Sequence, residues 1–339
     1  MRKVNEENEH IKRKYYQYLR TAKRKNKATI VKAAEAIQRF EASCNYASFK
    51  KFKIEQVVRF RDRLDTEISK TTGKPLAKST IASILAANKD FIFWLADKPS
   101  YKSRIGHSDA DYFNMDAKGQ RVARTVRETP YPSLDMVRHT FDAMPENTEV
   151  ERRDKVLIAF LMLTGARDGA MSSLRLKHVN PIDSYVFQDA REVRTKGSKT
   201  ITTYFLPVDP VYKEFFLAWV GYLQKDKLFG PDDPLFPPLE IGHKDGEFKV
   251  LGFQRTTYSN ANAIRKAVRQ AFETAGLPTF TPHAFRKTLV KWASAYYPTI
   301  EEFKAFSLNI GHSSVVTTAS AYCHVSLERQ AEIIKKKKS

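Results

Sequence analysis

Apolar residues recur three or four positions apart in several stretches of the first hundred residues, which is the spacing of amphipathic helices. Ser79 and Thr80 fit the N-cap of one such helix. A second covers residues 28–43, and a third lies between Val57 and Ile68. The residues predicted to face the core are Ala33, Ala34, Ile37, Phe40, Val57, Val58, Leu64, Ile68, Ile81, Ile84, Leu85, Asn88, Phe91, Ile92 and Leu95. With a basic helix before them, they predict a four-helix domain over residues 1–105.

Beyond Pro99 the helical spacing fades into Ser, Asp, Gly and Arg residues, and it returns only after Ser133. We therefore predict an interdomain linker over residues 106–132. A second domain follows over residues 133–325, and residues 326–339 form a C-terminal tail.

Within the second domain the spacing predicts mostly helices. Thr281-Pro282 fits a cap and first helical position, and Gly311 a helix end. Residues 184–206 alternate and are rich in β-branched residues, with Lys196-Gly197-Ser198 at their centre, so they predict a β-hairpin. The fold class is therefore mainly α with a small β-sheet (α+β). The predicted helices cover residues 134–144, 156–163, a segment beginning around Arg167, 210–224, 255–275, 282–295, 300–309 and a last segment before Tyr322.

Charge adds a partner class to this picture. The 339 residues contain 58 Lys and Arg against 38 Asp and Glu, a net charge of +20, and residues 1–130 hold 29 of these cations but only 15 of the acids. Such an excess points to a polyanion, either nucleic acid or an anionic membrane surface, with an acidic protein as a further alternative. The segment 12–27 interleaves Tyr15, Tyr16 and Tyr18 with basic residues, which fits a DNA-facing helix or, alternatively, a solvated face or flexible arm. Its eight cations are Lys12, Arg13, Lys14, Arg20, Lys23, Arg24, Lys25 and Lys27.

Several classes of protein are excluded by what the sequence lacks. Cys44 and Cys323 are the two cysteines and have no ligand spacing, so a disulfide framework or zinc site is not expected. The N-terminus lacks the apolar core of a signal peptide, and no run of about 18 apolar residues occurs. No metal-binding or nucleotide-binding signature is present either. We expect a cytoplasmic protein without metal or cofactor.

Candidate chemistry gathers in the second domain. His283 and Arg286 are three residues apart at a predicted helix start, which places both on one face beside the positive end of the helix dipole. Arg167 follows a Thr-Gly break, where a guanidinium and backbone N–H groups can hold a phosphate together. His312 follows Gly311, and Tyr322 lies ten residues later.

In this order, the segments resemble the tyrosine recombinase (phage integrase) family over residues 133–330. Leu235-Phe236-Pro237 is a further landmark of that family. The segments are Leu163-Thr164-Gly165-Ala166-Arg167, Thr195-Lys196-Gly197-Ser198-Lys199, His283-Ala284-Phe285-Arg286, Gly311-His312-Ser313-Ser314 and Ala321-Tyr322-Cys323-His324-Val325. The resemblance implies a helical core-binding domain followed by a catalytic domain, and a site-specific recombinase or integrase of a mobile element or phage.

The resemblance also implies roles for these residues. Tyr322 is the nucleophile that forms a 3′-phosphotyrosyl link, while Arg167 and Arg286 stabilise the charge on the phosphate. Lys196 is the general acid, with Lys199 as the alternative. His283 assists proton movement at the nucleophile, and His312 binds a non-bridging oxygen. The implied partners are double-stranded DNA at specific core sites, three further copies of the chain and accessory directionality factors.

Two features depart from the family pattern. Ala170 occupies a position that is usually acidic, and the spacing from His312 to Tyr322 is one residue longer than usual. Three alternatives stay open: a topoisomerase of type IB character, a catalytically silent DNA-binding protein of the same fold, which Ala170 motivates, and a non-DNA adaptor. The tail either docks into a neighbouring copy or is a frayed basic end.

Overall fold

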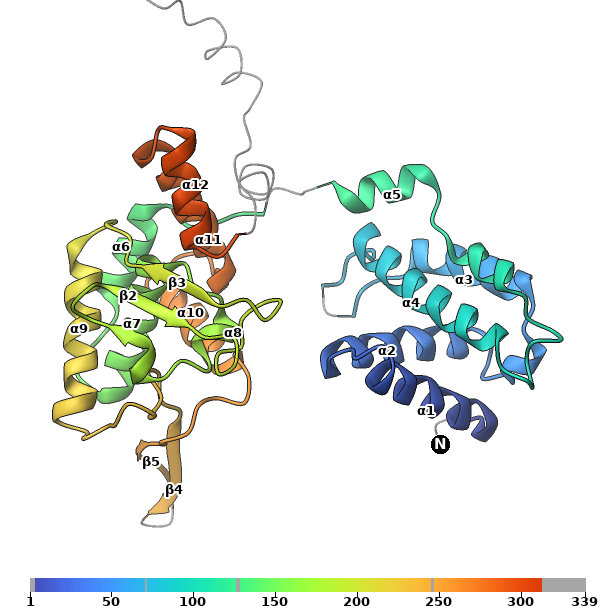
Figure 1. Cartoon of the computed structure of the whole chain (residues 1–339), viewed down its shortest axis with the longest axis horizontal. Helices are drawn as coiled ribbons and strands as arrows, with labels where there is room; N and C mark the ends of the chain where they lie inside the picture. Colours follow the sequence, from blue (N-terminus) through green and yellow to red (C-terminus); the bar gives the residue numbers. More distant parts are fainter. Residues whose placement is uncertain (1–3, 71, 126–128, 245–246, 313–339) are drawn as a thin grey trace, which may run out of the picture. The chain divides into compact units, whose positions relative to one another are not determined.

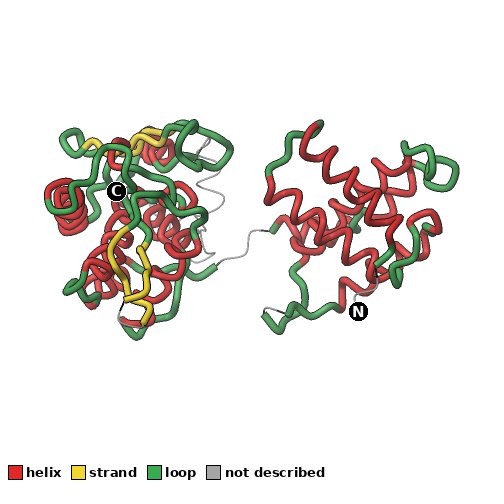
Figure 2. The backbone as a smooth tube through the Cα atoms, turned by 90° about the horizontal axis from the view of Figure 1, so that it is seen from below, coloured by secondary structure: helices red, strands yellow, loops and turns green. Residues whose placement is uncertain are grey.

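The computed structural model describes residues 4–70, 72–125, 129–244 and 247–312. The chain divides into two compact units, residues 1–127 (unit 1) and 128–339 (unit 2). Figure 2 shows that the regular structure of unit 1 is helical, whereas unit 2 combines helices with strands. No helix among the described residues is long and apolar enough to cross a membrane.

Unit 1 is built from helices that follow one another closely in the sequence (Figure 1). Asn5 and Asn26 cap the first two helices, because their side chains accept hydrogen bonds from the backbone N–H groups of Asn8 and Thr29. The elements are α1 (Glu6–Thr21), α2 (Lys27–Ser43), η1 (Phe49–Lys51), α3 (Ile54–Thr66), α4 (Lys78–Ala96), η2 (His107–Phe113) and α5 (Ala117–Arg124).

The predicted apolar face of α4 is confirmed, since all seven of its predicted residues are buried. On α3, Val57 and Leu64 are fully buried, but Val58 is 42% exposed. Ile68 lies beyond the end of that helix and is 52% exposed. The N-cap of α4 is Ala77 instead of the predicted Ser79 or Thr80. Helical spacing thus identified α3 and α4 correctly, but it wrongly included Val58 and Ile68 in the buried face of α3.

The segment predicted as a linker is largely part of unit 1. It contains η2 and α5, and Ala110 and Phe113 are buried in the core of that unit. The Phe113 ring packs edge-on against Phe40 with centroids 5.2 Å apart. The sequence pattern does not reveal this part of unit 1, because a few apolar residues can anchor a short 3₁₀ segment without any helical periodicity.

Unit 2 surrounds one almost completely buried helix, α7 (Glu149–Thr164). It packs against α9, α10 and α11, and an antiparallel sheet of order β1-β2-β3 lies beside it. The other elements are α6 (Leu134–Ala143), α8 (Asp168–Met171), η3 (Leu176–His178), β1 (Val179–Asn180), β2 (Tyr185–Gln188), β3 (Ile201–Tyr204), α9 (Pro210–Lys225), β4 (Leu239–Lys244), β5 (Glu247–Phe253), α10 (Asn262–Thr274), α11 (Pro282–Tyr296) and α12 (Ile300–Asn309).

The predicted fold class, mainly α with a small β-sheet, is confirmed. The hairpin over 184–206 is also confirmed, because β2 pairs with β3 from Tyr185 opposite Tyr204 to Gln188 opposite Ile201. The helix predicted over 255–275 begins only at Asn262, and β4 with β5 forms a second hairpin that the sequence pattern did not predict. The predicted helix before Tyr322 lies outside the described residues.

Candidate active site

Arg167 is placed by the way α7 ends. Gly165 adopts the left-handed conformation, with φ +56°, and turns the chain out of the helix. The Thr164 hydroxyl accepts a hydrogen bond from the Ala166 N–H at 3.1 Å and so fixes this turn. Arg167 then serves as the N-cap of the short helix α8 and is half-buried.

Arg286 is a buried cation, with only 1% of its surface exposed. It lies on the first turns of α11, which begins at Pro282 as predicted. Its guanidinium donates to the carbonyl oxygen of Gly165 and, at 2.7 Å, to that of Ile310. It also donates to Nε2 of His312 at 2.7 Å. Arg286 thus joins the end of α7 to the end of α12.

His312 is held at the end of α12 by a tight turn. Its backbone N–H donates to the Ser307 carbonyl oxygen at 3.0 Å, and Gly311 adopts φ +76°. A methyl group added at Gly311 would lie 2.7 Å from Ile201 Cδ1 and 3.6 Å from Arg167 Nη1. This close approach places His312 beside Arg167 as well as Arg286.

Lys196 lies at the exposed tip of the connection between β2 and β3, where Gly197 and Ser198 both have positive φ. Its charge nevertheless reaches the site, since it helps to lower the pKa of both His283 and His312. Lys199, the alternative candidate, lines a neighbouring open groove of about 530 Å³ together with Gly311 and His312.

Burial, together with the positive charges of the site, keeps both histidines neutral. Burial lowers the pKa of His312 to about 3, and the charges of Arg286 and Arg167 act in the same direction. Desolvation, followed by the same two arginines, lowers the pKa of His283. Because Arg286 can only donate, the Nε2 atom of His312 must accept, so the ring proton lies on Nδ1.

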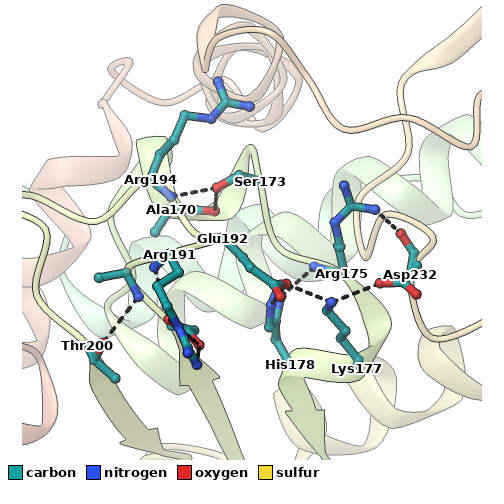
Figure 3. Close-up of polar contacts among 12 residues, drawn as sticks. Ala170, Ser173, Arg175, Lys177, His178, Arg191, Glu192, Arg194, Thr200 and Asp232 are labelled. Atoms are coloured by element: carbon teal, nitrogen blue, oxygen red, sulfur yellow. Dashed lines mark hydrogen bonds and ion pairs between the residues drawn. The ribbon is translucent and has the colours of Figure 1, made fainter. Parts of the chain in front are cut away.

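Ala170 is buried and carries no group that could replace the usual acid. Asp168, the nearest carboxylate in sequence, pairs with Arg265 of α10 at 2.5 Å. Instead, the Ser173 hydroxyl donates to the Ala170 carbonyl oxygen at 3.1 Å and accepts from the Arg194 N–H at 2.9 Å. Figure 3 shows this chain of contacts below Arg194. Neither Ser173 nor Arg194 was found from the sequence, because no spacing signals a contact of this kind.

The structure thus brings five of the six predicted catalytic residues together in unit 2, from four separate segments. These residues are Arg167, Lys196, His283, Arg286 and His312. The sixth, Tyr322, lies outside the described residues.

The basic segment of unit 1 differs from the prediction at one position. Lys12 is only 5% exposed and pairs with Glu41 at 2.5 Å and with Glu9 at 2.6 Å. Burial acts to lower the pKa of Lys12, but the hydrogen bonds to these two carboxylates outweigh it and raise the pKa. Lys12 is therefore an internal cation and does not face a ligand. The predicted cations that are exposed are Arg13, Lys14, Arg20, Lys23, Arg24, Lys25 and Lys27.

The predicted basic helix is also not a single helix in the structure. The segment 12–27 spans the second half of α1, the turn after it and the first residue of α2. Tyr15 is 2% exposed and packs against Phe91 and Trp94 with ring centroids 5.1 Å away in each case. Tyr15 therefore belongs to the core, while the exposed cations lie along α1, in the turn after it and at the start of α2.

A family model and a curated relative both relate this chain to phage integrases and recombinases. The model of the phage integrase family matches residues 133–329, more than half of the chain. A protein of Sinorhizobium fredii (strain NBRC 101917 / NGR234) named putative integrase/recombinase y4rF is 27% identical over 226 residues. The match covers 63% of this chain but only 47% of that relative, so the chain spans about half the length of the relative.

Solved structures share the fold across both units. A lambda integrase dimer bound to a COC′ core site is 12% identical, with a TM-score of 0.63 and coverage of 93% of this chain and 94% of that one. The XerH site-specific recombinase bound to a palindromic difH substrate is 16% identical, with a TM-score of 0.60 and coverage of 96% and 83%.

Proposed function

Since the chain belongs to the phage integrase family, whose model covers residues 133–329, we propose that it is a site-specific DNA recombinase. In this proposal it cuts and rejoins DNA strands through a covalent 3′-phosphotyrosyl intermediate. The observation that carries the proposal is the gathering of Arg167, Arg286, His283, His312 and Lys196 at one place in unit 2.

The two arginines can stabilise the negative charge that develops on the phosphate in the transition state. A phosphodiester is already anionic, and further charge develops on its non-bridging oxygens in the transition state. Arg167 and Arg286 offer guanidinium N–H donors to these oxygens, and burial of Arg286 makes its charge more effective than it would be in water. Because Arg286 is fixed by the carbonyls of Gly165 and Ile310, little reorganisation is required when the phosphate binds.

Proton transfer follows from the remaining groups. Tyr322 attacks phosphorus through its oxygen and loses its proton, while the bond from phosphorus to the 5′ oxygen breaks. His283, neutral because its pKa is lowered, accepts that proton. Lys196 donates a proton to the departing 5′ oxygen, and Nδ1–H of His312 donates a hydrogen bond to a non-bridging oxygen. Reversal by a different 5′ hydroxyl joins a new strand without an external energy source.

The exposed cations of unit 1 support the DNA-binding part of the proposal. They neutralise backbone phosphates in a sequence-independent manner, so binding weakens as salt rises. The functional state is a tetramer on two DNA core sites in the cytoplasm, assisted by accessory directionality factors. Residues 326–339 either dock into a neighbouring copy or remain a basic tail.

A covalent-adduct assay tests the proposal. Short duplexes tiled over the DNA that flanks the coding gene are each nicked at a different position, so that cleavage beside the nick releases a short fragment and traps the protein on DNA. We expect one duplex to give an adduct on a denaturing gel, and Tyr322→Phe to abolish it while duplex binding is retained. An adduct formed by Tyr322→Phe would show that another residue is the nucleophile.

The same proteins distinguish the alternatives. Efficient relaxation of a supercoiled plasmid without a target site would favour a topoisomerase of type IB character. Duplex binding without an adduct on any tiled duplex would favour a silent DNA-binding protein, a rival that Ala170 motivates. Absence of salt-sensitive duplex binding would favour a non-DNA adaptor.

A further inference from the structure

Arg194 lies two residues before Lys196 in the connection between β2 and β3. Its backbone N–H donates to Ser173 Oγ at 2.9 Å, and its Nη2 donates to the Ser172 carbonyl oxygen at 3.3 Å. Both serines directly follow α8, the short helix that begins at Arg167. Arg194 therefore joins the segment of one candidate catalytic cation to the segment of another (Figure 3).

The guanidinium of Arg194 also reaches a third segment. Its Nη1 donates to the Ser259 carbonyl oxygen at 2.5 Å, and its Nη2 donates to the Tyr258 carbonyl oxygen. These two residues belong to the loop that precedes α10. A planar guanidinium with several N–H donors can hold carbonyls of two segments at once, whereas a lysine ammonium is a single point of contact.

The backbone around Arg194 also packs against neighbouring segments. Val193 is 2% exposed, and a methyl group added at Gly169 would lie 3.5 Å from the Arg194 carbonyl oxygen. By contrast, Lys196 and the residues that follow it are exposed up to β3. The tip that carries Lys196 thus extends from a base that Arg194 anchors.

We propose that Arg194 is a positioning residue, which holds Lys196 where its ammonium can protonate the departing 5′ oxygen. The inference rests on the proposed function, in which Lys196 is the general acid. Lys196 has a long side chain on an exposed tip, so its encounter with one oxygen depends on a fixed base. Loss of the Arg194 contacts should lower the fraction of time that the Lys196 ammonium spends within hydrogen-bond distance of that oxygen.

The test uses two versions of the duplex that gives a covalent adduct. One has the natural 5′ oxygen at the scissile phosphate, and the other has a bridging sulfur in its place. A thiolate leaves without being protonated, so the sulfur duplex needs no general acid. Single-turnover rates of adduct formation are measured for wild type and for the variants Arg194→Ala, Lys196→Ala, Arg167→Ala and Arg191→Ala.

We expect Arg194→Ala to slow cleavage of the oxygen duplex by about 10- to 100-fold, part of the effect of losing a general acid. On the sulfur duplex it should react at nearly the wild-type rate, as should Lys196→Ala. Arg167→Ala should be slow on both duplexes. Arg191→Ala is the matched control, because Arg191 lies in the same connection, is 87% exposed and pairs with Asp189 of that connection. It should react like wild type on both.

A double variant separates positioning from a general structural role. If Arg194 acts through Lys196, then Arg194→Ala should cause no further slowing in a Lys196→Ala background. Additional slowing there, equal slowing on both duplexes, or an unchanged rate on the oxygen duplex would each overturn the inference. Circular dichroism checks that each variant folds. Arg194→Lys keeps the positive charge but loses the paired N–H donors of the guanidinium. It should slow cleavage of the oxygen duplex less than Arg194→Ala does, and it should also react at nearly the wild-type rate on the sulfur duplex. Absence of any wild-type adduct would instead refute the proposed function, and the inference with it.

Discussion

Replacing Lys12 with methionine should destabilise unit 1 by about 3 kcal/mol without weakening the DNA binding that we propose for it. The Lys12 ammonium lies 2.5 Å from Glu41 Oε2, and their side chains are 6% and 1% exposed. Removing one member of a buried ion pair costs about 3–5 kcal/mol, because the other charge is left without compensation. Glu41 keeps its hydrogen bond from Asn8 at 2.8 Å, which places the expected loss at the lower end. Methionine preserves most of the aliphatic stem, so packing changes little.

Lys14→Met is the matched control, because Lys14 lies on the same helix but is exposed. Hydrogen exchange of the α2 amides, measured by mass spectrometry on the full chain, reports the stability of unit 1. A salt titration of duplex binding counts the cations that contact phosphates. Lys12→Met should speed exchange and leave the salt dependence unchanged. Lys14→Met should leave exchange unchanged and lower the slope of log K against log salt by about 0.9, if Lys14 neutralises one phosphate. A lower salt slope with normal exchange in Lys12→Met would show that Lys12 leaves Glu41 to bind DNA, which would refute the reasoning.

Three further predictions concern unit 2. Arg286→Lys should lower the rate of adduct formation by about 100-fold or more, since an ammonium cannot replace the donors shared among Gly165, Ile310 and His312; a near-normal rate would show that charge alone suffices. His312→Gln should flatten the pH dependence of urea unfolding measured without DNA. The folded protein keeps His312 neutral down to a pKa of about 3, whereas in the unfolded chain His312 takes up a proton below about pH 6.5. The unfolding free energy of the wild type therefore falls by up to about 1.4 kcal/mol per pH unit as the pH drops between these two values. An unchanged pH slope in the variant would contradict this assignment. Gly311→Ala should lower the unfolding free energy by about 2–3 kcal/mol, because φ is +76° and the new methyl group meets Ile201 at 2.7 Å. The control Gly276→Ala, with φ +68° but open space, should lose only about 1 kcal/mol, and equal losses in the two would count against the steric explanation.

The sequence by itself determined most of the helices and the identity of the candidate site residues, but it missed η2 and α5 and began α10 too early. Helical spacing is a local property, so the buried face of α4 and the start of α11 at Pro282 could be predicted without knowledge of the fold. The left-handed glycines at 165 and 311 end helices for the same local reason, since glycine has no Cβ to oppose positive φ. The hairpin around Lys196 followed from strand alternation and a glycine turn.

Only the tertiary structure decided which charged residues face inward. The sequence gives Lys12 and Lys14 the same chemistry, but the packing of α1 against α2 places Glu41 beside Lys12 and buries the pair. In the same way, Ala110 and Phe113 belong to the core of unit 1 because of where α3 and α4 lie, and no local pattern marks them.

The site itself depends on contacts between distant segments. Arg286 meets Gly165 across 121 positions and His312 across 26, and Arg194 meets Ser259 across 65. Such contacts require the packing of α11 against α7 and of the β2–β3 connection against α8. The sequence therefore supplied the candidate reactive groups, while the fold of unit 2 determined the geometry of the five that the structure describes, the neutral state of the two histidines and the anchor that we propose for Lys196.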